Sequence, residues 1–120
     1  MTKQAPKPAL IYCRSASVPQ NDATVINEQE QQCRTWAAEM GYHVQSAYRD
    51  AGYSGMNMNR PGLHSLLAAL ITSATPHAVI IADRTRLSRN PVEWPTIIET
   101  FKDLNTELQI VAEMPTAASA

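Results

Sequence analysis

The stretch HAVIIA, residues 77–82, is apolar without interruption after its histidine, and this feature decides the fold. A short run with no polar alternation is typical of a strand that helices cover on both faces, as in a parallel sheet. A second run of this kind, ALIYC at residues 9–13, lies near the start of the chain. The two runs therefore predict buried strands of an α/β domain.

Working outward, helical and strand patterns alternate along the chain. Apolar spacing predicts helices over residues 22–40, residues 60–73 with Pro61 in the first turn, and a segment that starts at Asn90–Pro91. The residues expected to face the core are Ile26, Cys33, Trp36, Ala37 and Met40, then Leu63, Leu66, Leu67 and Leu70, then Trp94, Ile97, Ile98, Phe101 and Leu104. Further strands are predicted at 42–48, nearer the sheet edge, and at 108–112, with a Gly- and Asn-rich loop at 49–59. The order β-α-β-α-β-α-β predicts a three-layer α/β sandwich with a mainly parallel sheet of four or five strands.

The bulk properties narrow the class of protein. The chain has 120 residues and a net charge of −1, which fits one domain, expected over 9–112 with tails at 1–8 and 113–120. Both cysteines, Cys13 and Cys33, fall at core positions, which favours reduced thiols in a cytoplasmic protein. No apolar stretch reaches the length of a membrane span, and the three histidines form no metal motif, so neither membrane nor metal binding is expected.

Arginine accounts for seven of the ten basic residues, and six of the seven follow predicted strands. These six are Arg14, Arg49, Arg60, Arg84, Arg86 and Arg89. The carboxyl ends of parallel strands share one sheet edge, where open α/β sheets bind ligands. Crowded guanidiniums favour an anion, and phosphate suits their paired donors. The sequence therefore predicts a phosphate site at this edge.

Two glutamines accompany the arginines. Gln29 falls on or beside the apolar stripe of the first predicted helix, so it is either buried with hydrogen-bond partners or a partly exposed edge residue. Gln20 lies in the loop before that helix, where it is a candidate for ordering the loop.

Six motifs in order give the chain a family resemblance. Tyr12 and Arg14, then Gln20, then VINEQ ending at Gln29, then RDAGYSG with Asp50 and Ser54, then RPGL from Arg60, and then RLSRN with Arg86 and Arg89 span most of residues 9–112. This pattern resembles the catalytic domain of the serine recombinases, the resolvase/invertase family, in the style of the large serine recombinases. The resemblance implies a resolvase-like fold and site-specific DNA recombination.

The resemblance also implies a mechanism. In the family, a serine two residues after the first arginine attacks a DNA phosphodiester and forms a 5′-phosphoserine link, with no metal or other cofactor. Carried over, Arg14, Arg60, Arg86 and Arg89 hold the phosphate and stabilise the transition state. The implied supporting residues are Tyr12, Gln20, Gln29, Asp50, Ser54 and Thr85. The implied partners are DNA and, in the full-length protein, further copies in a homodimer or tetramer.

The chain departs from the family pattern at the nucleophile. The position two residues after Arg14 is Ala16, whose methyl group cannot attack phosphorus. Loss of a nucleophile costs at least ~10⁴-fold in rate. Ser17 is a substitute candidate, but a side chain on the adjacent residue starts several ångströms from the required place, whereas reacting groups are held to about 0.5 Å.

Two further departures from the family pattern concern an aspartate position and the domains that follow the catalytic domain. Thr85 stands where the family often has aspartate, and Asp83 is expected to point to the other side of an extended strand. Family members also continue into a long dimer helix and a DNA-binding domain, and the resemblance extends to neither, so we expect a catalytic core or a fragment of one. We therefore expect weak DNA binding, in keeping with the net charge.

A phosphate site at the sheet edge is compatible with three functions. The first is a recombinase catalytic domain silenced at Ala16. The second is a non-catalytic protein of the same fold that binds DNA or modulates an active recombinase. The third is a domain that binds a phosphorylated small molecule or receives a phosphoryl group, but the Gly-rich loop or acidic pair that it requires is missing.

Overall fold

A parallel sheet forms the middle layer of the protein, which we describe from a computed structural model over residues 6–16, 24–73 and 77–114. Within these residues the sheet has four strands in the order β2-β1-β3-β4, and every neighbouring pair is parallel. The strands are β1 (Lys7–Ser15), β2 (Tyr42–Ala51), β3 (Ala78–Ile81) and β4 (Glu107–Ile110). The predicted α/β sandwich and the edge position of the second strand are confirmed.

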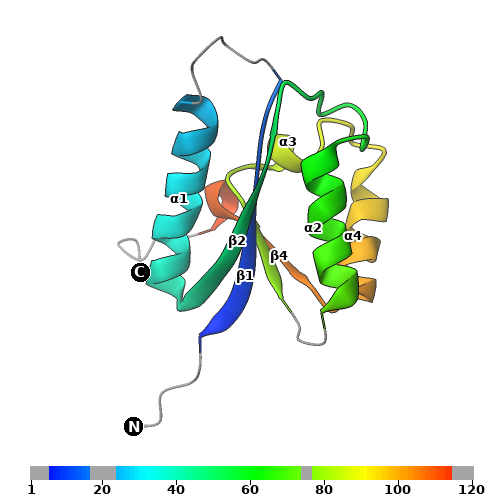
Figure 1. Ribbon diagram of the computed structural model, residues 1–120. Helices are drawn as coiled ribbons and strands as arrows, with labels where there is room; N and C mark the ends of the chain where they lie inside the picture. The colour runs from blue at the N-terminus through cyan, green and yellow to red at the C-terminus, as the bar shows by residue number, and fades with distance from the viewer. Residues whose placement is uncertain (1–5, 17–23, 74–76, 115–120) are drawn as a thin grey trace, which may run out of the picture.

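Helices cover both faces of this sheet (Figure 1). Helix α1 (Thr24–Met40) packs on one face, while α2 (Pro61–Thr72) and α4 (Trp94–Asp103) lie on the other. Side chains alternate along β1, so Leu10 and Tyr12 enter the core under α2 and α4, while Ile11 and Cys13 enter the core under α1. By the same alternation, the Arg14 side chain lies on the α2 face.

Both cysteines belong to the core under α1, as predicted. Cys13 and Cys33 are fully buried and free of disulfides. Burial raises the pKa of each thiol to about 12, because a thiolate would lose its hydration there. These thiols therefore stay protonated and act as small apolar side chains.

Strands β1 and β2 are longer than predicted. Their pairing runs from Lys7↔Tyr42 to Ser15↔Ala51, so β1 begins inside the segment expected to be a tail. Likewise, β2 extends to Ala51, whereas a loop was predicted to start at residue 49. Backbone pairing needs no apolar side chain, and β2 is an exposed edge strand, so the apolar pattern understates both lengths.

The helix boundaries differ at the third predicted helix. Asn90 Oδ1 accepts a hydrogen bond from the Val92 amide at 3.1 Å, which closes a turn, and α4 begins only at Trp94. Two short helices were not predicted: α3 (Arg84–Leu87) and the 3₁₀ turn η1 (Val111–Glu113), which ends β4 at Ile110. Segments of three or four residues are too short to show a period.

Two residues predicted to face the core are exposed. Met40 is 40% exposed because it is the last residue of α1, and Ile98 is 47% exposed because Ile97 and Phe101 take the buried positions of α4. The other predicted core residues of the helices are buried or partly buried. Among the described residues, no helix is both long and apolar enough to cross a membrane.

Candidate functional site

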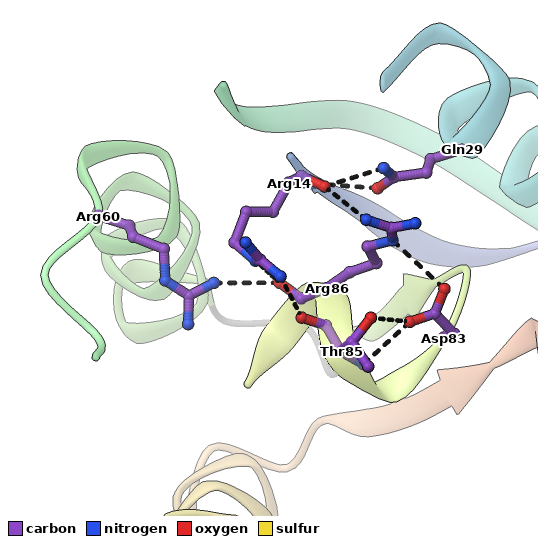
Figure 2. Close-up of polar contacts among 6 residues, drawn as sticks. All are labelled: Arg14, Gln29, Arg60, Asp83, Thr85 and Arg86. Atoms are coloured by element: carbon purple, nitrogen blue, oxygen red, sulfur yellow. Dashed lines mark hydrogen bonds and ion pairs between the residues drawn. The ribbon is translucent and has the colours of Figure 1, made fainter. Parts of the chain in front are cut away.

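Gln29 of α1 fixes the end of β1. Its side-chain amide forms two hydrogen bonds with the backbone of Arg14: Oε1 accepts from the Arg14 amide at 3.0 Å, and Nε2 donates to the Arg14 carbonyl at 2.9 Å (Figure 2). The glutamine is buried, so of the two alternatives the structure has a core residue with satisfied partners. An amide side chain thus extends the strand's hydrogen bonding where β1 leaves the sheet.

The Arg14 guanidinium is fully buried and reaches across to α3. Nη2 donates to the Thr85 carbonyl at 2.6 Å and Nε donates to the Arg86 carbonyl at 3.2 Å. Nη1 donates to the Tyr53 carbonyl at 2.8 Å, in the loop between β2 and α2. Arg14 therefore joins three segments through neutral acceptors, which leave its positive charge uncompensated.

Arg60, the residue that precedes α2, also donates hydrogen bonds to α3. Pro61 begins α2, as predicted, and the Arg60 side chain is fully buried. Nη1 donates to the Tyr12 hydroxyl at 3.0 Å and to the Arg86 carbonyl at 3.1 Å, and Nη2 donates to the Leu87 carbonyl. Two buried arginines thus share the carbonyls of one short helix, α3.

Asp50 anchors the other side of Tyr12. The Tyr12 hydroxyl donates to Asp50 Oδ2 at 2.7 Å, and burial raises the pKa of the Tyr12 hydroxyl. The same carboxylate accepts from the amides of Gly62 at 2.7 Å and Leu63 at 2.9 Å, at the start of α2. A Cβ on Gly62 would lie 2.6 Å from the Arg49 carbonyl, so the close approach of α2 to β2 requires glycine.

Asp83 lies differently from the sequence-based expectation. The chain turns into α3 at this point instead of staying extended, and Asp83 caps the helix, with Oδ1 accepting from the Thr85 amide at 2.9 Å and from the Thr85 hydroxyl. Its Oδ2 forms an ion pair with Arg86 Nε at 3.3 Å (Figure 2). The carboxylate therefore lies on the same side as Thr85 and Arg86, and the expectation was wrong. Residues two apart share one face of an extended strand as well, so alternation did not support it.

Four guanidiniums gather around these contacts. Arg86 Nη1 donates to the Arg14 carbonyl at 3.2 Å, and the Arg89 amide donates to the Gly55 carbonyl at 2.7 Å. The pKa of Arg14 is lowered, first by burial and then by the charges of Arg60, Arg89 and Arg86. We call Arg14, Arg60, Arg86 and Arg89 the arginine cluster; in the described part of the chain, only Arg86 has a carboxylate partner.

Arg49 and Arg84, also expected at this edge, turn away from the cluster. Arg49 forms an ion pair with Glu30 of α1, on the opposite face of the sheet. Arg84 forms an ion pair with Glu113 at 2.6 Å and lies 5.0 Å from the centre of the Trp94 ring. The prediction that six arginines converge is therefore wrong for these two, because neighbouring residues of a strand or helix face different directions.

The remaining candidate residues are exposed or lie outside the described residues. Ala16 is exposed at the bend that ends β1. Ser54 is exposed, and its hydroxyl accepts from the Met56 amide at 3.0 Å within its own loop. Ser17 and Gln20 lie outside the described residues. In the described segments, no group of His, Cys, Asp and Glu could hold a metal ion.

Sequence reasoning missed Gly55, which is buried against the cluster. A Cβ there would lie 2.8 Å from Arg14 Nη2 and 2.9 Å from Arg89 Cγ. The GYSG segment, with two glycines in four residues, was the available signal. Its meaning depends on contacts with residues far along the chain.

Comparison with known proteins gives one family and several similar structures. The family model described as the resolvase N-terminal domain matches residues 9–120. The N-terminal catalytic domain of TP901-1 integrase is 27% identical with a TM-score of 0.81, covering 95% of this chain and 85% of that one. The C-terminal catalytic domain of ISC1926 TnpA, an IS607-like serine recombinase, is 28% identical with a TM-score of 0.74, covering 87% of this chain and 70% of that one.

A more distant structure shows the same fold. A resolvase family site-specific recombinase from Streptococcus pneumoniae is 17% identical with a TM-score of 0.76, covering 95% of this chain and 78% of that one. Comparison with curated protein sequences gives no match. The similarity to solved structures spans nearly the whole chain and therefore includes the segments that build the arginine cluster.

Proposed function

This chain belongs to the resolvase N-terminal domain family, and from that premise we propose that it is a serine recombinase catalytic domain that binds DNA phosphates but is silenced at Ala16. The resolvase-like fold supports site-specific recombination in general. The proposal goes further in assigning the phosphate site to the arginine cluster and in assigning the loss of chemistry to one position.

The uncompensated charge of the arginine cluster is the observation that supports this function most. Arg14, Arg60 and Arg89 have no carboxylate partner among the described residues. Arg14 and Arg60 are also fully buried, and burying a guanidinium without a carboxylate is unfavourable. A phosphate would supply the missing negative charge and accept paired hydrogen bonds from guanidiniums. The proposed ligand is therefore a phosphodiester of DNA.

The two kinds of arginine would meet that phosphate differently. Arg89 is exposed and Arg86 is half-buried, so these two can contact a phosphate without rearrangement. Arg14 and Arg60 donate to carbonyls of α3, so a phosphate would have to replace some of those acceptors. Tyr12, Gln29 and Asp50 then act by holding Arg14, Arg60 and the start of α2 in place.

The proposed supporting roles of Gln20, Ser54 and Thr85 rest on the family resemblance. Thr85 has the best placement, because its carbonyl accepts from Arg14 and its hydroxyl donates to Asp83. Ala16 favours a second function with the same site: a non-catalytic protein that occupies DNA or pairs with an active recombinase. In either function, the proposed assembly is a homodimer or tetramer, or a complex with an active partner subunit.

DNA affinity tests the phosphate site. Fluorescence anisotropy with a labelled duplex should show weak, salt-sensitive binding that is lost in the Arg86→Ala/Arg89→Ala variant. The matched control, Arg34→Ala/Arg49→Ala, removes the same net charge from the α1 face, where both arginines pair with Glu30. Equal losses in the two double variants would contradict a localised phosphate site.

Covalent chemistry tests the role of Ala16. The chain, with and without Ala16→Ser, is placed in a chimera that supplies the dimer helix and DNA-binding domain of an active relative. We expect a covalent protein–DNA product on a denaturing gel only with Ala16→Ser, a difference of at least ~10⁴-fold in rate. Cleavage by the unsubstituted chimera would show that the chain is not silenced.

A further inference from the structure

Gly55 lies between two arginines of the cluster that are far apart in the sequence. A Cβ at this position would be 2.8 Å from Arg14 Nη2, 3.0 Å from Arg14 Cζ and 2.9 Å from Arg89 Cγ. All three distances are shorter than a van der Waals contact between heavy atoms allows. The space that a side chain would need is thus already filled by Arg14 and Arg89.

The glycine is required for space and not for backbone conformation. Gly41 and Gly52 have φ of +82°, a value that favours glycine, whereas the backbone of Gly55 is not in that region. Any small residue could therefore adopt the Gly55 backbone. The three nearest heavy atoms that a side chain would meet belong to the two arginines.

The loop that contains Gly55 also holds both arginines by hydrogen bonds. The Tyr53 carbonyl accepts from Arg14 Nη1 at 2.8 Å, and the Gly55 carbonyl accepts from the Arg89 amide at 2.7 Å. The loop is joined to β1 as well, since the Ser15 carbonyl accepts from the Gly52 amide at 2.8 Å. A movement of this loop would therefore move Arg14 and Arg89 relative to each other.

We propose that Gly55 is a positioning residue that sets the separation between the Arg14 guanidinium and the Arg89 side chain, so that both reach one phosphate. Its missing side chain leaves room for the Arg14 guanidinium and the Arg89 side chain to lie close together, while loop carbonyls accept from the Arg14 guanidinium and from the Arg89 backbone amide. The inference rests on the proposed function for its ligand, but the spacing itself can be tested without DNA.

A double-mutant cycle on thermal stability tests the spacing. Gly55→Ala should lower the melting temperature by about 5–10 °C, because the methyl group overpacks the site. Adding Arg89→Ala removes Cγ and should restore part of that loss, since the Arg89 amide keeps its bond to the loop. The control, Gly41→Ala, strains a left-handed residue with nothing within 4 Å, and Arg89→Ala should not rescue it.

The cycle gives a decision even if one variant does not fold. An unfolded Gly55→Ala variant with a folded double variant supports the spacing role. Simple additivity of the two substitutions, or failure of both variants to fold, overturns it, because the glycine would then matter for a reason other than Arg89.

DNA binding then tests the consequence for the ligand. Gly55→Ala should weaken binding of the labelled duplex and reduce the slope of log affinity against log salt by about one, as for the loss of one phosphate contact. Gly41→Ala, with a comparable loss of stability, should keep the affinity and the salt slope of the unsubstituted chain. Unchanged affinity and slope in Gly55→Ala would overturn the positioning role.

Failure of the proposed function has a different signature. If the unsubstituted chain shows no salt-dependent binding, the phosphate site is wrong and Gly55 has no ligand to position. The stability cycle would then still show whether Gly55 sets the spacing of the arginines, so the two failures are distinguishable.

Discussion

Arg14 and Arg49 lie near the ends of neighbouring strands, one residue out of register, yet they have opposite surroundings. Arg49 pairs with Cys13 across the sheet, and Arg14 pairs with Asp50, so the two arginine side chains lie on different faces. The Arg49 side chain is 43% exposed and meets a carboxylate, Glu30. Arg14 is fully buried and meets only carbonyls.

The difference teaches that position at the sheet edge does not by itself mark a binding residue. An arginine that finds a carboxylate on a helix surface is neutralised by the protein and contributes little beyond that pair. An arginine buried among carbonyls keeps its charge for a ligand. The face of the strand, set by a single residue of register, decides between the two outcomes.

The largest expected effect is on stability. Arg14→Met leaves the carbonyls of Tyr53, Thr85 and Arg86 without these donors, which should cost at least about 3 kcal/mol, since each buried unsatisfied group costs about 1–3 kcal/mol. Arg49→Met removes a half-exposed ion pair and should cost about 0.5 kcal/mol. Urea unfolding measures both, and equal losses would break the comparison.

Two residues of α1 contact the two arginines: Gln29 binds the Arg14 backbone, and Asn27 binds the Arg49 side chain. Gln29→Leu leaves the Arg14 amide and carbonyl without the glutamine, so we expect a loss of about 2 kcal/mol and faster hydrogen exchange at Arg14. Asn27→Leu removes only the exposed contact to Arg49 and should change stability by at most about 0.5 kcal/mol. Unchanged exchange at Arg14 in Gln29→Leu would contradict the assigned role of Gln29.

Arg89 and Arg84 extend the comparison to DNA affinity. Arg89→Ala should weaken duplex binding about fivefold and lower its salt slope by about one. Arg84 is neutralised by Glu113, so Arg84→Ala should leave the slope unchanged. Anisotropy titrations at several salt concentrations measure both, and a matching change in slope for Arg84→Ala would remove the distinction between paired and unpaired arginines.

The smallest effect depends on pH. Hydrogen bonds from Arg34 and Arg49 lower the pKa of Glu30, so its pairing stabilises the fold above the unfolded pKa of about 4.3 and is lost as the pH falls through the folded value. The stability difference between the unsubstituted chain and Arg49→Met should therefore shrink progressively as the pH falls below the unfolded pKa of Glu30. The difference for Arg14→Met should persist, because carbonyls do not titrate; a parallel decline would contradict this contrast.

Much of the fold could be predicted from local patterns. Apolar runs and helical stripes identify the four strands and the three longer helices, and their alternation gives the parallel sheet. The ends of β1 and β2 could not be predicted, because backbone pairing alone extends them. Helix α3 has four residues, too few for a pattern.

The site was predictable in its residue types and less so in its geometry. The topology of parallel sheets predicted that Arg14, Arg60, Arg86 and Arg89 gather at one edge, and the family resemblance selected these four from the six arginines there. The place of Gln29 beside the apolar stripe left its burial open. The departure of Arg49 depends on strand register, and the importance of Gly55 depends on contacts between residues 14, 55 and 89. Such contacts exist only once the whole chain has folded.

The bonds from Arg14 to α3 also bear on the order of folding. They span 71 and 72 residues of chain, whereas the pairing of β1 with β2 needs only the helix between them. Closing a longer loop costs more entropy, so contacts of high sequence separation form slowly. We expect β1, α1 and β2 to assemble during synthesis before α3 has left the ribosome. In that intermediate, Arg14 has none of its α3 acceptors, and the cluster comes into being only as the last third of the chain arrives.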